Sequence, residues 1–345
     1  MKFEKIYFVI LFFTSGYNIT DINIQSKVLF LKKAIILSLI FCILFTTACT
    51  GRSTLEEADA NAPVTVEDIR DKTTVASSSA GSSSQAVTSP FTGRPVLLPM
   101  TFTVNDPENT RGLSTERKEH SFGVAKNGIP HDISKSTQKY FESTGYKAVC
   151  YDTKTDEKVL YLTFDCGWEN GCTDEVLDTL KEKKVPAAFF CTLDHIKSSP
   201  DLIARMINEG HIVGNHSAKH PNFSQISRQR MADEILECEN YLRENYGYST
   251  KFFRFPEGSY NESALELVSS MGITSVFWSS AYADWDVNKT KGKQYAFDTV
   301  TARLHPGAVL LLHSVSPDNA AALGDIIDWA RNNGYVFRSL NDIKM

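Results

Sequence analysis

The chain has 345 residues, of which 42% are hydrophobic and 22% are charged, and its formal net charge at neutral pH is -5. A chain of this length and composition can bury one ordinary globular core and have residues left over. Because it has no surplus of basic residues to release counterions from phosphates, the composition argues against nucleic acid as a partner.

Residues 1–48 have the composition of a signal segment. Lys32 and Lys33 precede an apolar run over 34–45, and small residues then lead into Cys49. The run is short for a membrane span but suits the apolar region of a signal peptide. Its end resembles a bacterial lipobox, which implies acylation of Cys49; an uncleaved anchor is the alternative. Either interpretation places the rest of the chain outside the cytoplasm, anchored to the outer face of the bacterial cytoplasmic membrane.

Residues 49–116 are predicted to form a linker attached to that lipid. Most of this segment is poor in aromatic residues and rich in Ser, Thr and Ala, with a serine-rich run at 77–84. Because such a composition buries too little apolar surface to offset the entropy of ordering, we expect a flexible tether. A more ordered composition near His120 sets the expected start of the folded domain at about Arg117, so that the domain spans 117–345.

Strand-like and helix-like segments alternate from Val159 onward, which is typical of a parallel α/β architecture. Seven strands are predicted at 159–164, 186–192, 211–215, 251–255, 274–279, 308–313 and 335–338. The helices between them are predicted at 173–184, 199–210, 227–246, 262–271, 294–304 and 317–333. Seven such units fit a distorted or incomplete (β/α)7 barrel better than a doubly wound sheet.

Polar residues lie at the ends of five of the seven predicted strands. Asp165 and Arg254 end two of the strands, His313 ends a third, and His216 and Asp284 each follow a strand. In parallel barrels the active site gathers at the C-terminal edge of the strands, so we expect these side chains to converge.

Two histidines, His216 and His220, are spaced four residues apart. A short helical segment there would direct both imidazoles at one cation. A carboxylate such as Asp165 beside a two-histidine cation site is suited to activating water, which predicts a metal-dependent hydrolase.

Five short motifs, in this order and in this strand context, resemble those of the polysaccharide deacetylase (NodB-homology) family, the fourth carbohydrate esterase family. They are Thr163-Phe164-Asp165-Cys166, His216-Ser217-Ala218-Lys219-His220, Arg254-Phe255-Pro256-Glu257-Gly258, Asp284-Trp285 and Leu310-Leu311-Leu312-His313. The resemblance covers about 159–340. The stretches 167–171 and 127–130 are most similar to the members that act on peptidoglycan muramic acid, including those that make muramic δ-lactam.

The resemblance implies that the chain is a monomer that hydrolyses the N-acetyl group of a cell-wall glycan and releases acetate. The sugar would be N-acetylmuramic acid or N-acetylglucosamine. Asp165 would be the general base, held ionised by Arg254. His313 would be the general acid that protonates the departing amine, oriented by Asp284.

The resemblance also implies a cation and a pocket for the acetyl group. His216 and His220 would bind a divalent cation, for which imidazole ligands favour Zn²⁺, with Co²⁺, Mn²⁺ or Ni²⁺ as alternatives. Trp285 and Leu311 would wall a pocket for the acetyl methyl group. A backbone N–H near Glu257 would help to stabilise the oxyanion.

Cys166 departs from the family pattern, which usually has a second Asp at this position. Its thiolate would be a good zinc ligand and is a candidate third ligand; alternatively, Cys166 is a neutral side chain, and waters complete the two-histidine site. The domain has five cysteines, so at least one thiol is free, and a Cys166–Cys172 disulfide would remove Cys166 from the cation.

Two other functions use the same residues. One is an esterase that removes O-acetyl groups from xylan-like polymers. The other is a non-catalytic glycan-binding lipoprotein that kept the fold. Retention of both Asp165 and His313 argues against the binding protein, because binding alone needs neither residue.

Overall fold

The structure, a computed structural model, describes residues 87–345 with the exception of 122 and 156. The expected signal segment, Cys49 and the first part of the expected linker lie outside the described residues. None of the helices in the described part of the chain has the length and apolar character needed to cross a membrane.

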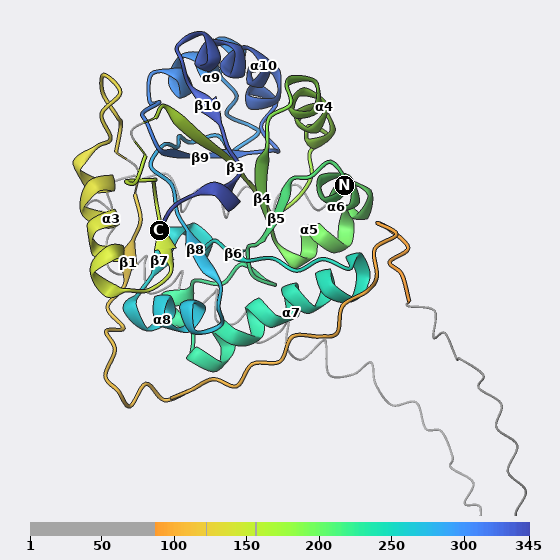
Figure 1. Ribbon diagram of the computed structural model, residues 1–345, viewed down its shortest axis with the longest axis vertical. Helices are drawn as coiled ribbons and strands as arrows, with labels where there is room; N and C mark the ends of the chain where they lie inside the picture. Colours follow the sequence, from red (N-terminus) through yellow and green to blue (C-terminus); the bar gives the residue numbers. More distant parts are fainter. Residues whose placement is uncertain (1–86, 122, 156) are drawn as a thin grey trace, which may run out of the picture. The chain divides into compact units, whose positions relative to one another are not determined.

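A parallel sheet of eight strands, curled on itself, forms the centre of the domain (Figure 1). Along the sheet the order is β10 (Val336–Phe337), β3 (Val159–Cys166), β4 (Ala187–Cys191), β5 (Ile212–Asn215), β6 (Phe252–Phe253), β8 (Thr274–Val276) and β2 (Ala148–Val149), and β9 (Ala308–His313) pairs with the other side of β3. Single bridges from Ser280 to Leu310 and from Tyr151 to Ala308 bring the far end of the sheet back to β9. The expected distorted or incomplete barrel is therefore confirmed.

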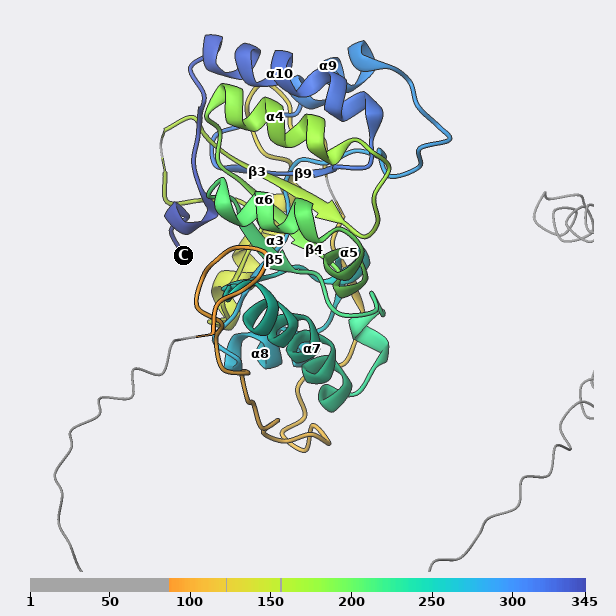
Figure 2. The ribbon, with the colours of Figure 1, turned by 90° about the vertical axis from the view of Figure 1, so that its right-hand side faces the viewer.

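Helices surround the sheet on its outer side. Figure 2 shows α4, α9 and α10 together at one end and α7 and α8 at the other. The helices are α3 (Asp132–Thr144), α4 (Thr173–Lys183), α5 (Leu193–Ser198), α6 (Pro200–Asn208), α7 (Arg228–Tyr246), α8 (Glu262–Ser270), α9 (Lys293–Thr301) and α10 (Pro317–Asn332). A second, antiparallel pair joins β1 (Lys118–Glu119) to β7 (Ser259–Tyr260). Short 3₁₀ turns occupy Phe223–Gln225, Pro256–Gly258 and Leu340–Asp342.

All seven predicted strands are present, and so are the six predicted helices, with ends that differ by up to three residues. Five further elements are present that were not predicted: the helices α3 and α5 and the short strands β1, β2 and β7. α3 is capped at its start by His131, whose side chain accepts a hydrogen bond from the Ile133 backbone, and at its end by Gly145 in the left-handed conformation. It precedes the alternating pattern from which the other elements were predicted.

Strand β3 is buried along its whole length and separates two layers of core. Leu160, Leu162, Phe164 and Cys166 pack into the layer under the outer helices, whereas Tyr161 packs into the layer inside the curled sheet. Burial of a Leu or Phe side chain stabilises a fold by about 1.5–3 kcal/mol. Because side chains alternate along a strand, Asp165 projects to the inner side and Cys166 to the outer side.

Residues 87–116, which we expected to belong to the linker, pack against the domain where the structure describes them. This segment runs along α7 and past α8 (Figure 1). Thr92 donates from Oγ1 to the Tyr246 carbonyl at 2.7 Å, and the Leu97 backbone N–H donates to the Arg243 carbonyl at 3.0 Å. Val104 is buried. The packed domain thus starts ahead of Arg117, and the prediction failed because side-chain contacts with a distant helix leave no mark on local composition.

Candidate active site

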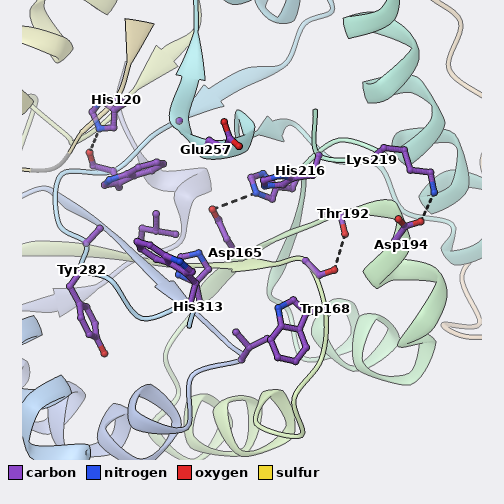
Figure 3. A pocket seen from close by; sticks show the side chains of 18 of the residues that line it. His120, Asp165, Trp168, Thr192, Asp194, His216, Lys219, Glu257, Tyr282 and His313 are labelled. Carbon is purple, nitrogen blue, oxygen red and sulfur yellow. Dashed lines mark hydrogen bonds and ion pairs between the residues drawn. The ribbon is translucent and has the colours of Figure 1, made fainter. Parts of the chain in front are cut away.

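A cavity of about 790 Å³ opens at the C-terminal edge of the parallel strands. Figure 3 shows Asp165, His216 and His313 projecting into it from three different segments. The other predicted site residues that line the cavity are His220, Trp285, Leu311 and Glu257. Arg254 and Asp284 lie behind this wall and contact residues in it.

Arg254 is completely buried and holds Asp165 in place. Its Nη1 donates to Oδ1 of Asp165 at 2.6 Å, and its Nη2 donates to Oγ1 of Thr163 at 2.8 Å. Its Nε donates to the Val276 carbonyl, and its guanidinium lies 4.1 Å from the centre of the Phe190 ring. Burial disfavours the ionised carboxylate of Asp165, but the nearby Arg254 charge outweighs it and lowers the pKa of Asp165. Asp165 is therefore an oriented carboxylate.

His216 presents one ring nitrogen to the cavity. Its Nδ1 lies 2.8 Å from the Arg254 backbone carbonyl, an acceptor, so the proton is assigned to Nδ1. The other nitrogen, Nε2, lies 3.6 Å from Oδ2 of Asp165 and keeps its lone pair. Burial lowers the pKa of His216 to about 4, which keeps the imidazole neutral. A neutral imidazole fixed through its other nitrogen is a good cation ligand.

His216 and His220 meet, but not on a helical turn as the sequence analysis expected. Their ring centres are 4.9 Å apart. The backbone between them is irregular, with positive φ angles of 69° at Ser217 and 55° at His220. Side-chain acceptors hold this loop: Oδ1 of Asn215 accepts from the Ser217 N–H, and Oγ of Ser217 accepts from the His220 N–H, both at 2.9 Å. These local bonds replace helical ones.

His313 and Asp284 form a second pair across the cavity from His216. Asp284 accepts from Nδ1 of His313 at 2.7 Å and from the His313 backbone N–H at 2.9 Å. Asn319 donates to the same carboxylate at 2.5 Å. Burial disfavours the imidazolium, but the charge and hydrogen bond of Asp284 outweigh it and raise the pKa of His313. His313 is therefore held ready to carry a proton.

Two tryptophans and a leucine shape the cavity around these groups. Trp168 and Trp285 are exposed large hydrophobic residues, at 48% and 55% of their surface, and the Trp285 ring contacts the His313 ring edge-on at 5.9 Å between centres. Leu311 is buried behind them. Glu257 has a left-handed backbone with a φ of 59°, and its carboxylate accepts from Asn222.

Cys166 does not belong to this cavity, so the prediction of a thiolate that completes the histidine pair is wrong. Its Sγ lies on the outer face of β3, 3.2 Å from Oγ of Ser314. The physical reason is strand alternation: a residue directly after Asp165 points away from Asp165. The five cysteines of the described region are all free, so the structure has no Cys166–Cys172 disulfide.

Several site residues were missed by the sequence analysis. Asn319 orients Asp284 but stands in no pattern that marks chemistry. Thr163 belongs to the motif that contains Asp165, but its bond to Arg254 was not predicted. Trp168, His120, Lys219 and Asp194 also line the cavity. Two signals could have found members of this set: Trp168 lies in the stretch 167–171 just after the Asp165 motif, and Lys219 lies between His216 and His220.

The comparisons with known proteins agree with this architecture. The family model for polysaccharide deacetylase matches residues 152–276. A relative that is 42% identical over 223 residues, and of which the chain covers 84%, belongs to the same family. The chain is therefore a member of the polysaccharide deacetylase family, a family of hydrolases.

That relative is the peptidoglycan-N-acetylmuramic acid deacetylase PdaA of Bacillus subtilis, which matches 64% of this chain. A solved structure of B. subtilis PdaA, a family 4 carbohydrate esterase, superimposes with a TM-score of 0.63 at 39% identity, covering 67% of this chain and 98% of that one. A family 4 carbohydrate esterase from Bacillus anthracis gives a TM-score of 0.54 at 37% identity, covering 67% of this chain and 97% of that one.

Proposed function

We propose that this protein hydrolyses the N-acetyl group of N-acetylmuramic acid in peptidoglycan. The observation that carries the proposal is that one cavity holds a group suited to accept a proton and a group suited to donate one. The pKa of Asp165 is lowered, so it is an ionised base, and the pKa of His313 is raised, so it can act as an acid. The B. subtilis relative is named for this sugar at 42% identity, whereas a Bacillus cereus relative named for N-acetylglucosamine is 32% identical. Both names indicate deacetylation of a cell-wall polysaccharide.

A divalent cation fits the histidine pair. His216 is neutral, directs Nε2 into the cavity and lies beside the His220 ring. Such a cation, with Zn²⁺ favoured by imidazole ligands, would polarise the acetamide carbonyl and make water more acidic. We infer that His216 and His220 hold it, with water in the remaining positions because Cys166 lies on the far face of β3.

The two cavity groups would then share the proton transfers. Asp165, ionised and fixed by Arg254, would accept a proton from the water that attacks the acetamide carbon. His313 would donate a proton to the nitrogen as the carbon–nitrogen bond breaks, and Asp284 would stabilise the imidazolium until then. The water oxygen bonds to the acetamide carbon and the carbon–nitrogen bond breaks. The products are therefore acetate and a free amine.

The exposed faces of Trp168 and Trp285 would receive the sugar rings. Both tryptophans stand at the rim of the cavity, and aromatic faces are effective platforms for flat apolar surfaces. Leu311, a buried residue of β9 that lines the same cavity, would contact the acetyl methyl group. This arrangement would direct the acetamide toward Asp165 and His313.

The test uses the full-length chain, stripped of metal and reloaded with Zn²⁺, on peptidoglycan whose stem peptides are present or removed. Mass spectrometry would follow acetyl loss from each sugar, with Asp165→Asn as control. We expect Zn²⁺-dependent loss from muramic acid, reduced by about 10²–10⁴-fold in the variant. Loss from glucosamine alone would correct the sugar. Release of acetate only from O-acetylated xylan would establish the esterase, and no release from any glycan would favour the binding protein.

We also propose that Cys49 is acylated and holds the protein on the outer face of the cytoplasmic membrane. The support is the order of Lys32-Lys33, the apolar run over 34–45 and the small residues before Cys49. A glycan substrate outside the cytoplasm is consistent with that location.

A further inference from the structure

Behind the candidate active site, on the outer face of the sheet, lies a second group of potential metal ligands. Sγ of Cys166, Sγ of Cys191 and a ring nitrogen of His195 all lie within 4.8 Å of one another. Cys166 and Cys191 are direct partners at the ends of β3 and β4, and His195 lies in α5, which follows β4. All three side chains are fully buried. None of them lines the active-site cavity.

The imidazole of His195 is the unexplained group in this cluster. Among the described residues, neither of its ring nitrogens has a hydrogen-bond partner, although both are buried. A buried polar atom without a partner destabilises a fold by about 1–3 kcal/mol, so such groups are rare. The two buried histidines that line the active-site cavity each have one ring nitrogen bonded to a carbonyl: Nδ1 of His216 to that of Arg254, and Nε2 of His120 to that of Trp278. Burial lowers the pKa of His195, which leaves a neutral ring with a free lone pair.

We propose that Cys166, Cys191 and His195 form a separate structural site for a thiophilic divalent cation of the zinc class. Two thiolates and one imidazole are the ligand types that zinc prefers in structural sites. Tetrahedral zinc holds neighbouring ligand atoms about 3.5–4 Å apart, so small side-chain rotations would close the cluster. On binding, the two thiols release their protons to solvent and the imidazole supplies its lone pair. A water or the Ser314 hydroxyl, 3.2 Å from Sγ of Cys166, would take the fourth position.

The competing chemistry is a disulfide between Cys166 and Cys191. Oxidation of two adjacent thiols would use both sulfurs but leave the His195 nitrogens without partners. A cation satisfies all three side chains at once, and this favours the metal.

The backbone of the cluster is hydrogen-bonded to the loop that carries His216, so a bound cation would help to fix that loop. The Cys191 carbonyl accepts from the His216 N–H at 3.0 Å, and the Cys166 carbonyl accepts from the Thr192 N–H at 3.1 Å. The Leu193 N–H donates to the Ser217 carbonyl at 3.1 Å. A cation at this point would therefore clamp the ends of β3 and β4 and the loop that carries His216.

The test separates this site from the histidine pair. The full-length chain carrying His216→Ala and His220→Ala is prepared under reducing conditions and titrated with Cd²⁺, whose thiolate complexes absorb in the ultraviolet. We expect one Cd²⁺ per chain with thiolate-to-cadmium absorption. Adding Cys166→Ser or His195→Gln should weaken binding by about tenfold or more. Cys150→Ser is the matched control, because Cys150 is equally buried but lies in the other core layer, where its thiol contacts the Ser134 carbonyl, and it should leave binding unchanged.

Absence of the thiolate absorption from the double-histidine variant would overturn the proposal. A Cys166–Cys191 disulfide found by peptide mapping of the chain isolated without reductant would also overturn it. A test that needs no substitution is the anomalous signal of Cd²⁺ in crystals of the unaltered chain. A peak between Cys166, Cys191 and His195 supports the site, and a peak only beside His216 and His220 refutes it.

Discussion

Replacing Arg254 with methionine should both destabilise the fold and change the pH dependence of turnover. The substitution removes the partner of the Asp165 carboxylate and the donors to the Thr163 hydroxyl and to the Val276 carbonyl. Breaking a buried ion pair by removing one partner lowers the free energy of unfolding by about 3–5 kcal/mol. Urea denaturation at neutral pH, followed by circular dichroism, would measure this loss.

The same substitution should shift the acidic limb of the pH–rate profile to higher pH. Arg254 lowers the pKa of Asp165, so its removal raises that pKa. Since Asp165 must be ionised to accept a proton, activity would then be lost at a higher pH than in the unaltered chain.

A double substitution supplies the control for the effect on stability. In Arg254→Met with Asp165→Asn no charge is left unpaired, so this chain should be more stable than Arg254→Met alone. If Arg254→Met costs less than about 1 kcal/mol, the value typical of an exposed ion pair, and leaves the acidic limb in place, the argument from the buried pair is refuted.

Three further substitutions test other parts of the site and the anchor. Asp284→Asn removes the charge that raises the pKa of His313, so the basic limb of the pH–rate profile should move to lower pH; an unmoved limb would show that His313 is not the acid. His216→Ala should reduce bound Zn²⁺ by one ion per chain and abolish turnover, and unchanged stoichiometry in a metal analysis would rule out the histidine pair. Cys49→Ala should release the protein from membranes on fractionation; continued retention would favour an uncleaved anchor.

The strands and the edge residues could be predicted because each rests on a short local pattern. A buried apolar run that ends in a polar residue places Asp165, Arg254 and His313 at one edge, and parallel pairing brings them together. The same pattern also contained the reason why Cys166 could not join the histidine pair, because adjacent residues of a strand face opposite sides. The face of the strand on which a residue lies is therefore as informative about its role as its residue type.

The remaining features depend on contacts that are distant in sequence or on single side chains. The loop between His216 and His220 follows from the hydrogen bonds of Asn215 and Ser217, which compete with a helical turn. Asn319 reaches Asp284 from the first turn of α10, across 35 positions of sequence. Neither contact has a periodic signal, so neither could be read from the chain alone.

The packing of residues 87–116 against the domain has a consequence for proteolytic release. A protease that cuts ahead of Val87 would free a domain with all its described contacts. A cut between Met100 and Arg117 would instead detach the segment that bonds to Tyr246, Arg243 and Asn240, while leaving every candidate catalytic residue in the larger fragment. Each such hydrogen bond contributes about 0.5–1.5 kcal/mol, so the fragment would keep the site but unfold more readily. The place of the cut would thus set how long the fragment stays folded.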